Sequence, residues 1–320
     1  MKKWIFVFAS VLSFNTYGAN DCGDDLDNNC WDCGRSDSDL CTARLNGTTL
    51  SVTGTGEMKD YGWHRGNIDE GEAKFITNAP WGNSEKGNTE IENITIDGIT
   101  RVGNSAFLGS TNLENITFSD SVVEIGENAL HSSGLTHLEL PPNLKTLGGG
   151  AIENLQFIRE IVLPDGLETI GNGGFDGWHS LESIVIPDSV QTIGKYVFSD
   201  TPNLKSIVIG NGVISIEETA FSGVQQFCYS ENKNECGTRV YIYCQNTAER
   251  SCRDLIGENN SEVLDRLRLY SVDDNGKIKV GSKTYDSLSD LPQYKLRRIY
   301  TIDEANAAAG PVNRVSIRYR

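Results

Sequence analysis

Residues 181–198 read LESIVIPDSVQTIGKYVF, and the apolar side chains in this stretch fit neither one amphipathic helix nor one alternating strand. The same pattern returns several times along the 320-residue chain. One position of it recurs at intervals of 22 or 23 residues and is held by Gly103, Gly126, Gly148, Gly171, Gly194 and, in the sixth copy, Glu217. An internal repeat of this length is typical of a solenoid, in which each short unit stacks on the next.

Each repeat provides three sets of apolar side chains that would point inward. The first strand supplies the pairs Ile94/Ile96, Ile116/Phe118, Leu138/Leu140, Ile161/Leu163, Ile184/Ile186 and Ile207/Ile209. The second strand supplies Ile99/Val102, Val122/Ile125, Leu144/Leu147, Leu167/Ile170, Val190/Ile193 and Val213/Ile216, and a third column holds Phe107, Leu130, Ile152, Phe175, Phe198 and Phe221. Burying one repeat gains roughly 10 to 20 kcal/mol, and ordering its residues costs at least as much. The repeats should therefore fold only as a stack.

Prolines and glycines divide each repeat at fixed positions. Pro141, Pro164 and Pro187 are expected to end the first strand, because proline cannot donate to the ladder. The glycine column is expected to let the backbone bend tightly after the second strand.

The unit LESIVIPDSVQTIGKYVFSDTPN resembles the BspA-like class of leucine-rich repeats over about residues 91–224. The preceding LNGTTLSVTGTGEMKDYG, with APWGN after an insertion, is similar to the lead-in of such proteins. Many family units carry a cysteine three residues after the Phe; this chain has Ser110, Ser133, Leu155, Trp178 and Thr201 there. The resemblance implies an exported or cell-surface bacterial protein that binds proteins or other surfaces, and no shared catalytic site.

The N-terminal sequence predicts export. Residues 1–19 contain two lysines, a short apolar run and then small or polar residues, which is the layout of a secretory signal peptide. No later segment is apolar enough to cross a bilayer, and the C-terminal residues NRVSIRYR are charged. We therefore expect a secreted or cell-surface protein without a transmembrane span.

The eight cysteines form two groups of four, namely Cys22, Cys30, Cys33 and Cys41, then Cys228, Cys236, Cys244 and Cys252. Even numbers in an exported chain favour disulfides, although each group allows three internal pairings. Two alternatives involve the CxxC of Cys30 and Cys33. The first is a zinc site, but the spacings on either side of the CxxC are unlike those of a zinc ribbon. The second is thioredoxin-like redox chemistry, but no βαβ pattern surrounds Cys30. The two groups flank the repeats, so disulfide-stapled caps are expected at both ends of the stack.

Charge is unevenly distributed along the chain. The net charge of −16 and the pI of about 4.7 disfavour nucleic acid as a partner. Residues 277–320, by contrast, hold nine Lys and Arg against four Asp and Glu. Attachment to a surface through this basic C-terminal tail is a hypothesis that follows.

These patterns divide the chain into five parts. We expect a signal peptide over residues 1–19, a cysteine-rich N-terminal cap and lead-in over 20–90, about six leucine-rich repeats over 91–224, a cysteine-rich C-terminal cap over 225–272, and a small basic module over 273–320. In the last part, Asn275-Gly276 predicts a hairpin, and Thr301 with Glu304 fits the capping box of a short helix. The fold class is thus a mostly β solenoid with stapled caps and a small α+β appendage.

The first strand also offers a candidate ligand-binding surface. The residue between two inward side chains must point outward, because side chains alternate along a strand. Three successive repeats place valine there, which would form an apolar stripe beside acidic and hydroxyl side chains. The residues proposed for ligand binding are Glu139, Glu160, Val162, Ser183, Val185, Ser206 and Val208. The alternative is that valine simply suits strands.

Enzymatic signals are weak in this sequence. The chain has four histidines, His64, His131, His137 and His179, and neither an HExxH nor a GxSxG motif surrounds them. Residues 24–29 resemble the start of a calcium loop but lack its glycine and closing glutamate, so we expect neither metal nor cofactor. The favoured function is adhesion or recognition of an extracellular or cell-surface protein. An envelope scaffold without a specific ligand is the alternative, and a hydrolase in the cysteine-rich segments is a third.

Overall fold

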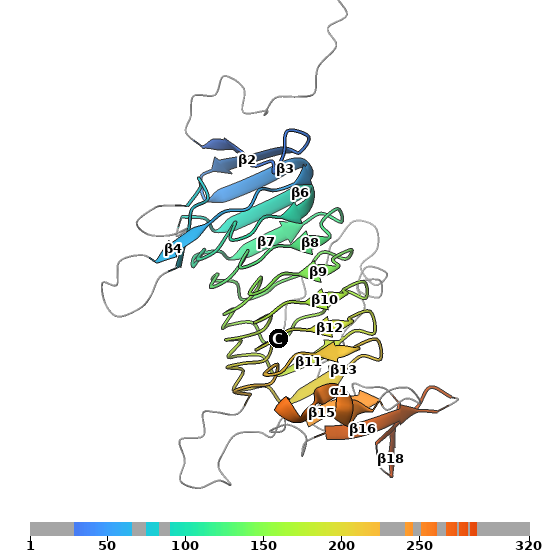
Figure 1. Cartoon of the computed structure of the whole chain (residues 1–320). Helices are drawn as coiled ribbons and strands as arrows, with labels where there is room; N and C mark the ends of the chain where they lie inside the picture. The colour runs from blue at the N-terminus through green and yellow to red at the C-terminus, as the bar shows by residue number, and fades with distance from the viewer. Residues whose placement is uncertain are drawn as a thin grey trace, which may run out of the picture.

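The computed structural model describes residues 29–65, 75–82, 90–224, 241–245, 251–260, 267–273, 275–280 and 282–286. They wind into an elongated stack of turns, with the blue N-terminal strands at one end and the orange C-terminal strands at the other (Figure 1). The expected solenoid is confirmed. The signal peptide expected over residues 1–19 and the capping box at Thr301 and Glu304 lie outside the described residues.

The first strands of successive turns form a parallel ladder, called the first wall below. Its members are β3 (Thr49–Glu57), β6 (Asn93–Val102), β7 (Asn115–Phe118), β11 (Ser183–Ile186), β13 (Ser206–Ile209), β15 (Tyr241–Gln245) and β16 (Leu267–Val272). Equivalent residues of neighbouring turns face each other, as Ile94 faces Ile116 and Ile184 faces Ile207. The ladder consists of two blocks, because the two turns between β7 and β11 contain no first-wall strand although all their residues are described.

A second ladder, the second wall, runs through the stack without interruption. It joins the C-terminal half of β6 to β8 (Glu124–Ile125), β9 (Thr146–Leu147), β10 (Thr169–Ile170), β12 (Thr192–Ile193) and β14 (Ser215–Ile216). Every pairing is parallel, and the inward residue of each strand faces its repeat equivalent, as Ile125 faces Leu147. The period of the sequence therefore sets the register.

The third column of the repeat lines the remaining side of the core, called the third wall. Phe175, Phe198 and Phe221 are fully buried and stack, with ring centroids 5.9 and 5.5 Å apart. Phe107 belongs to the same column, because the Phe107 N–H donates to the carbonyl of Ala129 in the next turn at 2.8 Å. The expected row of bulky side chains is confirmed.

The glycine column has a different role from the one expected. None of its five glycines has a positive φ, so a sharp bend does not explain them. An added Cβ would instead meet the backbone of the preceding turn. On Gly103 it would lie 1.8 Å from the carbonyl oxygen of Lys59, and on Gly171 it would lie 2.6 Å from the carbonyl carbon of Gly148. Glycine is required because neighbouring turns approach too closely for a side chain, which is a tertiary and not a local requirement.

The bends lie instead at two columns of left-handed residues in the third wall. One column holds Ser105, Asn128, Gly150, Gly173, Tyr196 and Thr219, and the other holds Gly109, Ser132, Asn154, Gly177, Asp200 and Gly223. All have φ between 46° and 80°. Such a conformation is strained for side chains such as Tyr and Thr, so the packed turns on either side must impose it.

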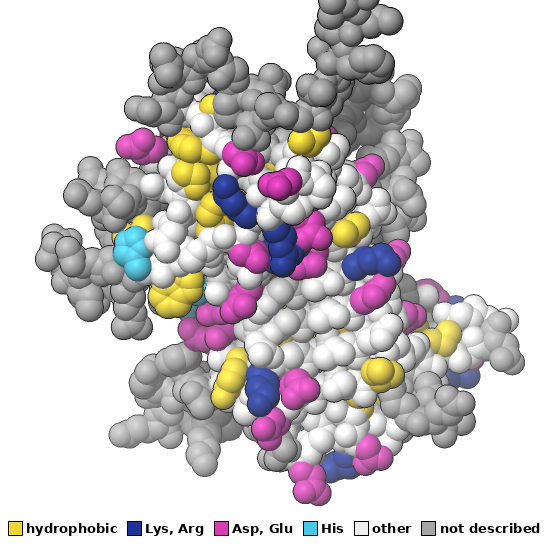
Figure 2. All heavy atoms as spheres, turned by 45° about the horizontal axis from the view of Figure 1, so that its top comes forward, with side chains coloured by type: hydrophobic (Ala, Val, Ile, Leu, Met, Phe, Trp, Pro, Cys, Tyr) yellow, Lys and Arg dark blue, Asp and Glu magenta, His cyan; other side chains and the backbone are white. Residues whose placement is uncertain are grey.

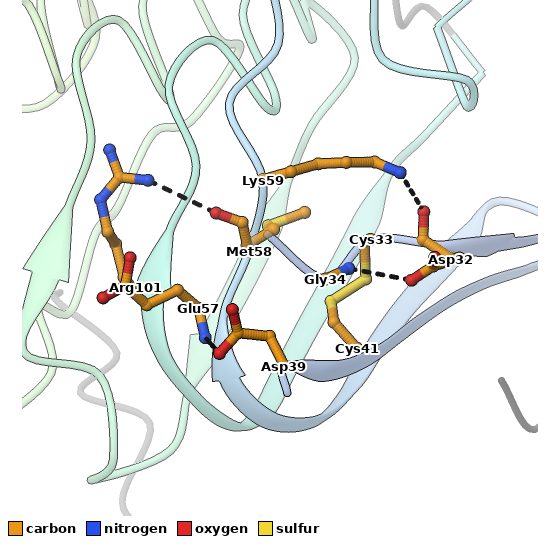
Figure 3. Close-up of a disulfide and its surroundings, with 9 residues drawn as sticks. All are labelled: Asp32, Cys33, Gly34, Asp39, Cys41, Glu57, Met58, Lys59 and Arg101. Atoms are coloured by element: carbon orange, nitrogen blue, oxygen red, sulfur yellow. Dashed lines mark hydrogen bonds between the residues drawn. A yellow bond between two sulfur atoms is a disulfide. The ribbon is translucent and has the colours of Figure 1, made fainter. Parts of the chain in front are cut away.

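An antiparallel meander caps the N-terminal end of the stack. β1 (Cys30–Asp32) pairs with β2 (Leu40–Asn46), and β2 pairs with β3, which begins the parallel ladder. The Cys33–Cys41 disulfide closes this meander, and Lys59 Nζ donates to the Asp32 carbonyl beside it at 2.6 Å (Figure 3). A short hairpin, β4 (Trp63–Arg65) and β5 (Phe75–Thr77), extends from the same end.

A buried arginine joins this cap to the first repeats. The Arg101 guanidinium hydrogen-bonds Asp60 at 2.7 Å, Glu124 at 2.8 Å and Asn104 Oδ1 at 2.9 Å. It also reaches the Met58 carbonyl at 3.4 Å, on the chain that leads from the disulfide cap (Figure 3). A buried charge with these partners is satisfied, and it fixes the cap to the second wall.

At the C-terminal end the parallel ladder continues past Val224. β15 and β16 add two further strands to the first wall, and Cys244 takes the inward position of Ile209. α1 (Cys252–Ile256) covers the core with two buried side chains, and a Cys244–Cys252 disulfide holds it. Asn260, in η1 (Glu258–Asn260), is buried, and its side-chain oxygen accepts a hydrogen bond from the Phe221 N–H at 3.4 Å. In the earlier turns the equivalent N–H donates to a backbone carbonyl of the next turn, as Phe198 does to Ala220.

Both described disulfides join neighbouring cysteines eight residues apart. The sequence left this choice open. Cys30 is also disulfide-bonded, and because Cys33 bonds to Cys41, the CxxC does not act as a pair. Cys22, Cys228 and Cys236 lie outside the described residues.

The expected hairpin at Asn275-Gly276 is confirmed. β16 runs antiparallel to β17 (Ile278–Val280), which pairs with β18 (Lys283–Tyr285). Gly276 has φ 75°, and the Asp273 carboxylate accepts from the backbone N–H groups of Asn275 and Lys277. These bonds pre-form the tight turn.

Candidate ligand-binding surface

The outward side chains of the first wall form one column along the stack. Thr95 faces Thr117 in the N-terminal block, whereas Val185 faces Val208 and Val208 faces Tyr243 in the C-terminal block. Glu139 and Val162 hold the same repeat position in the two turns between the blocks. A ligand that lies along the first wall would meet these side chains in sequence.

The column is exposed at Thr117 and over its middle turns, and it is covered toward the C-terminal end. The Glu139 side chain is 74% exposed and Val162 is 44% exposed. Glu160 and Val185 are half-buried, and Val208 is only 1% exposed. Glu139, Glu160 and Val162, which lie in the two middle turns and are exposed or half-buried, are called the central patch below.

Three residues of the expected surface are not available to a ligand. Ser183 and Ser206 are buried, as is Val208. Val208 packs in a small second hydrophobic cluster with Tyr243, Tyr270 and Ile278, against which Val185 is partly buried. The expected stripe of three exposed valines is therefore wrong at Val208, because the β16–β17 hairpin and β15 contribute side chains to the same face.

The central patch combines negative charge with an apolar side chain. His137 Nε2 lies 3.4 Å from Glu139 Oε1, and this interaction raises the pKa of His137. Glu160 and Val162 lie in the following turn. Such a surface can contact Lys or Arg side chains of a partner through its carboxylates and an apolar side chain through Val162.

The Lys and Arg side chains of the repeats are mostly paired, but the surface remains acidic. Residues 91–224 hold 17 Asp and Glu against five Lys and Arg. In Figure 2 most dark blue Lys and Arg side chains lie beside magenta Asp or Glu. Ion pairs link turns at Lys145–Glu168, Lys195–Glu218 and Lys205–Glu182, with separations of 3.2, 3.7 and 2.7 Å. These exposed pairs contribute little stability, and the excess carboxylates leave a negative surface.

A second polar cluster lies on the third wall, and the sequence analysis did not identify it. His131 Nε2 lies 3.3 Å from Glu153 Oε1, and His179 Nε2 lies 2.8 Å from Asp200 Oδ2. Asp176 lies near both acids, and its burial together with the negative charge of Glu153 and Asp200 raises its pKa to about 6. These residues follow the Phe column in successive turns, which is the signal that could have revealed the cluster.

Part of this cluster has the residues and the order of contacts of a catalytic triad, but the backbone N–H groups beside its serine are already bonded. Ser132 Oγ lies 2.8 Å from His131 Nδ1, while the other ring nitrogen faces Glu153. The N–H of Ser132 donates to the Glu153 carbonyl and that of Ser133 to the Leu130 carbonyl. The backbone donors that an oxyanion hole at Ser132 would need are therefore already used.

The fourth histidine, His64, faces the Asn78 amide oxygen at 2.8 Å. Within the described residues, no group of three or more His, Cys, Asp or Glu could hold a metal ion. None of the described helices is long and apolar enough to span a membrane. The calcium-like residues 24–28 lie outside the described part of the chain.

Comparison with known proteins gives one family and several solved structures. The family model described as "BspA type Leucine rich repeat region (6 copies)" matches residues 85–200 and 168–290, which together span well over half of the chain. A leucine-rich repeat protein of T. pallidum is 20% identical, with 54% of this chain and 80% of that chain covered and a TM-score of 0.38. One from Eubacterium ventriosum is 17% identical, covering 79% and 48%, with a TM-score of 0.34. A leucine-rich cell surface protein of Faecalibacterium prausnitzii is 15% identical, covering 64% and 86%, with a TM-score of 0.27. No curated protein matches.

Proposed function

The chain belongs to the BspA-type leucine-rich repeat proteins, and from this premise we propose that it is exported and binds protein or cell-surface ligands through the outer face of the first wall. The observation that carries the proposal is the central patch. Glu139, Glu160 and Val162 stay accessible in the middle turns, whereas Ser206 and Val208 farther along the same face are covered.

The form of the surface supports binding of a macromolecule. The patch belongs to the folded stack, because the side chains Leu138, Leu140, Ile161 and Leu163, which neighbour its residues in sequence, are buried. Side chains that stand on a packed core lose less entropy when a partner binds than those of an unfolded segment. An accessible strip of side chains on the outer face suits a protein surface or an extended segment more than a small molecule, which would need a concave site.

Two features support a location outside the cytoplasm. The first is the signal-peptide layout of residues 1–19. The second is the disulfides, which persist in oxidising compartments. The basic tail of residues 277–320 could in addition hold the acidic protein at an anionic surface.

The test is direct binding of purified full-length protein to immobilised extracellular-matrix proteins. A patch variant carries Glu139→Gln, Glu160→Gln and Val162→Ser. A matched control carries Glu168→Gln, Glu218→Gln and Ile214→Ser, which lie just before or just after strands of the second wall; Ile214 is 74% exposed. Binding should be lost in the patch variant, be retained in the control, and weaken with added salt because carboxylates contribute to it.

Equal binding by the patch variant and the unmodified protein would reject the central patch. Absence of binding to every matrix protein tested would favour the alternative, an envelope scaffold without a specific ligand. Circular dichroism of both variants shows whether the fold is intact. A version ending at Val272 separates attachment from recognition, because loss of surface retention alone would assign the tail to anchoring.

A further inference from the structure

The first wall is interrupted in the middle of the stack. β3, β6 and β7 form an N-terminal block, and β11, β13, β15 and β16 form a C-terminal block. Between them lie the two turns that contain residues 136–141 and 159–164, called the seam below. These segments form no strands, and their inward residues Leu138, Leu140, Ile161 and Leu163 belong to no strand pair of the described chain.

The inward residues from β7 through the seam are slightly more exposed than those of the C-terminal block. Leu138, Leu140, Ile161 and Leu163 are 4% to 6% exposed, and Ile116 in β7, at the edge of the seam, is 8% exposed. Phe118, also in β7, is only partly buried. In the C-terminal block Ile184, Ile186, Ile207 and Ile209 are 0% to 1% exposed. The inward face of the first wall is therefore packed most loosely from β7 through the seam.

The aromatic row of the third wall is also divided at this level. Phe107 packs near Trp81 in the N-terminal block, with ring centroids 6.0 Å apart. Phe175, Phe198 and Phe221 stack in the C-terminal half. The two intervening positions hold Leu130 and Ile152, which fill the core without linking the two aromatic groups.

The second wall, by contrast, is continuous through the seam. β8, β9 and β10 pair in register on either side of it, and Gly148 and Gly171 donate to the preceding turn at 2.9 Å. Backbone hydrogen bonds of the third wall cross the seam as well: the Leu130 N–H donates to the Ala151 carbonyl at 2.8 Å, and the Asn154 N–H donates to the Asp176 carbonyl at 2.7 Å. Two walls of the stack are thus hydrogen-bonded throughout, and the first wall has a gap. The stack can bend when this gap widens, because no strand pairing has to break there.

We infer that the seam is a flexure: the two blocks move as rigid bodies, and the stack bends about the continuous second and third walls by opening and closing the first wall at residues 136–141 and 159–164. Motion of this kind needs few contacts to change in one region while the flanking regions stay packed. Within the C-terminal block, by contrast, separation would break the pairing of four residues of β11 with four of β13.

The cause of the seam lies in its residues. β11 and β13 both read SIVI, with β-branched residues at every apolar position. The equivalent segment 137–140 reads HLEL, and segment 160–163 reads EIVL. Leucine and charged residues favour strands less than isoleucine and valine do, so the seam is the weakest place in the ladder.

The flexure has a consequence for binding. The central patch lies on the seam, with the N-terminal block on one side and the C-terminal block on the other. A partner that contacts both blocks would fix the angle between them. The flexure itself does not depend on that partner and is tested without it.

The test uses distances between spin labels in two matched pairs. Glu114→Cys with Glu182→Cys spans the seam beside the first wall, and Val123→Cys with Gln191→Cys spans it on the second wall. Both pairs are 68 residues and three repeats apart. The described cysteines are all disulfide-bonded, so the labels attach to the new thiols. Pulsed electron resonance should give a broader distance distribution for the first-wall pair than for the second-wall pair.

Equally narrow distributions for the two pairs would overturn the flexure. A second variant adds Leu138→Ile, Leu140→Ile and Leu163→Ile, which give both seam segments β-branched apolar residues like those of β11 at nearly constant volume. It should narrow the first-wall distribution and leave the second-wall distribution unchanged. An unchanged first-wall distribution in this variant would show that these residues do not create the flexure.

Discussion

Gly171 tests most sharply how neighbouring turns are packed. A Cβ at this position would lie 2.6 Å from the carbonyl carbon of Gly148 and from the nitrogen of Gly149, both in the backbone of the preceding turn. Backbone atoms cannot swing aside as a flexible side chain would. The substitution Gly171→Ala should therefore push the two turns apart.

The size of the effect follows from two distances. Ordinary contact begins at 3.4 Å, so a Cβ at 2.6 Å requires the turns to separate by about 0.8 Å. The Gly171 N–H donates to the Leu147 carbonyl at 2.9 Å, and this bond would lengthen to about 3.7 Å, beyond hydrogen-bonding range. Losing the bond costs about 1 kcal/mol and overpacking costs roughly 1 to 3 kcal/mol. Gly171→Ala should lower the free energy of unfolding by about 2 to 4 kcal/mol.

The matched control is Gly149→Ala, in the turn next to Gly171. Its Cβ would meet nothing closer than 3.6 Å, and Gly149 does not have a positive φ. Alanine there should be neutral or stabilise by up to about 1 kcal/mol, since it restricts the unfolded chain. The free energy of unfolding of both variants is measured by urea titration, with tryptophan fluorescence as the signal and the urea midpoint as the readout. If the two variants unfold within about 0.5 kcal/mol of each other, the close-approach explanation of the glycine column is wrong.

Three further predictions concern the core, the caps and pH. Phe198→Leu removes two ring stacks and should lower the free energy of unfolding by about 1 to 3 kcal/mol. Phe107→Leu should lower it by less. Equal urea midpoints for the two variants would contradict the stacking argument. Reducing the Cys33–Cys41 disulfide should raise amide exchange in the N-terminal cap before the central repeats, and the reverse order would show that it does not hold the cap. Asp176→Asn should stabilise the protein above pH 6 and change little below about pH 4. The folded pKa of about 6 exceeds 3.8, so the stability associated with the protonated carboxyl is lost as pH rises through 6. Because Asp176 is half-exposed, we expect the substitution to raise the free energy of unfolding above pH 6 by only about 1 kcal/mol. Thermal unfolding at several pH values measures this. A difference between the two proteins that does not change with pH would contradict the raised pKa of Asp176.

The outer face of the first wall shows that a strand pattern predicts which side chains point outward but not which of them stay exposed. Alternation along the strand correctly placed Val185 and Val208 opposite each other on the outer face. Exposure on that face is decided elsewhere, because Val208 is buried against Tyr243 and Ile278, which come from later in the chain. The sequence pattern ended at Val224, so it carried no signal for these later strands.

What the sequence determined by itself is the architecture. A period of 22 to 23 residues with three apolar columns specifies a stack of turns, since burial of those columns requires a neighbour in register, and the Asn-Gly pair specifies the hairpin. Only the tertiary structure decided which outward side chains stay exposed, why the glycine column has no side chain, and where the first wall is interrupted. These features depend on distances between residues that are one or more turns apart, and such distances are set by the packing of the whole stack rather than by the local chain.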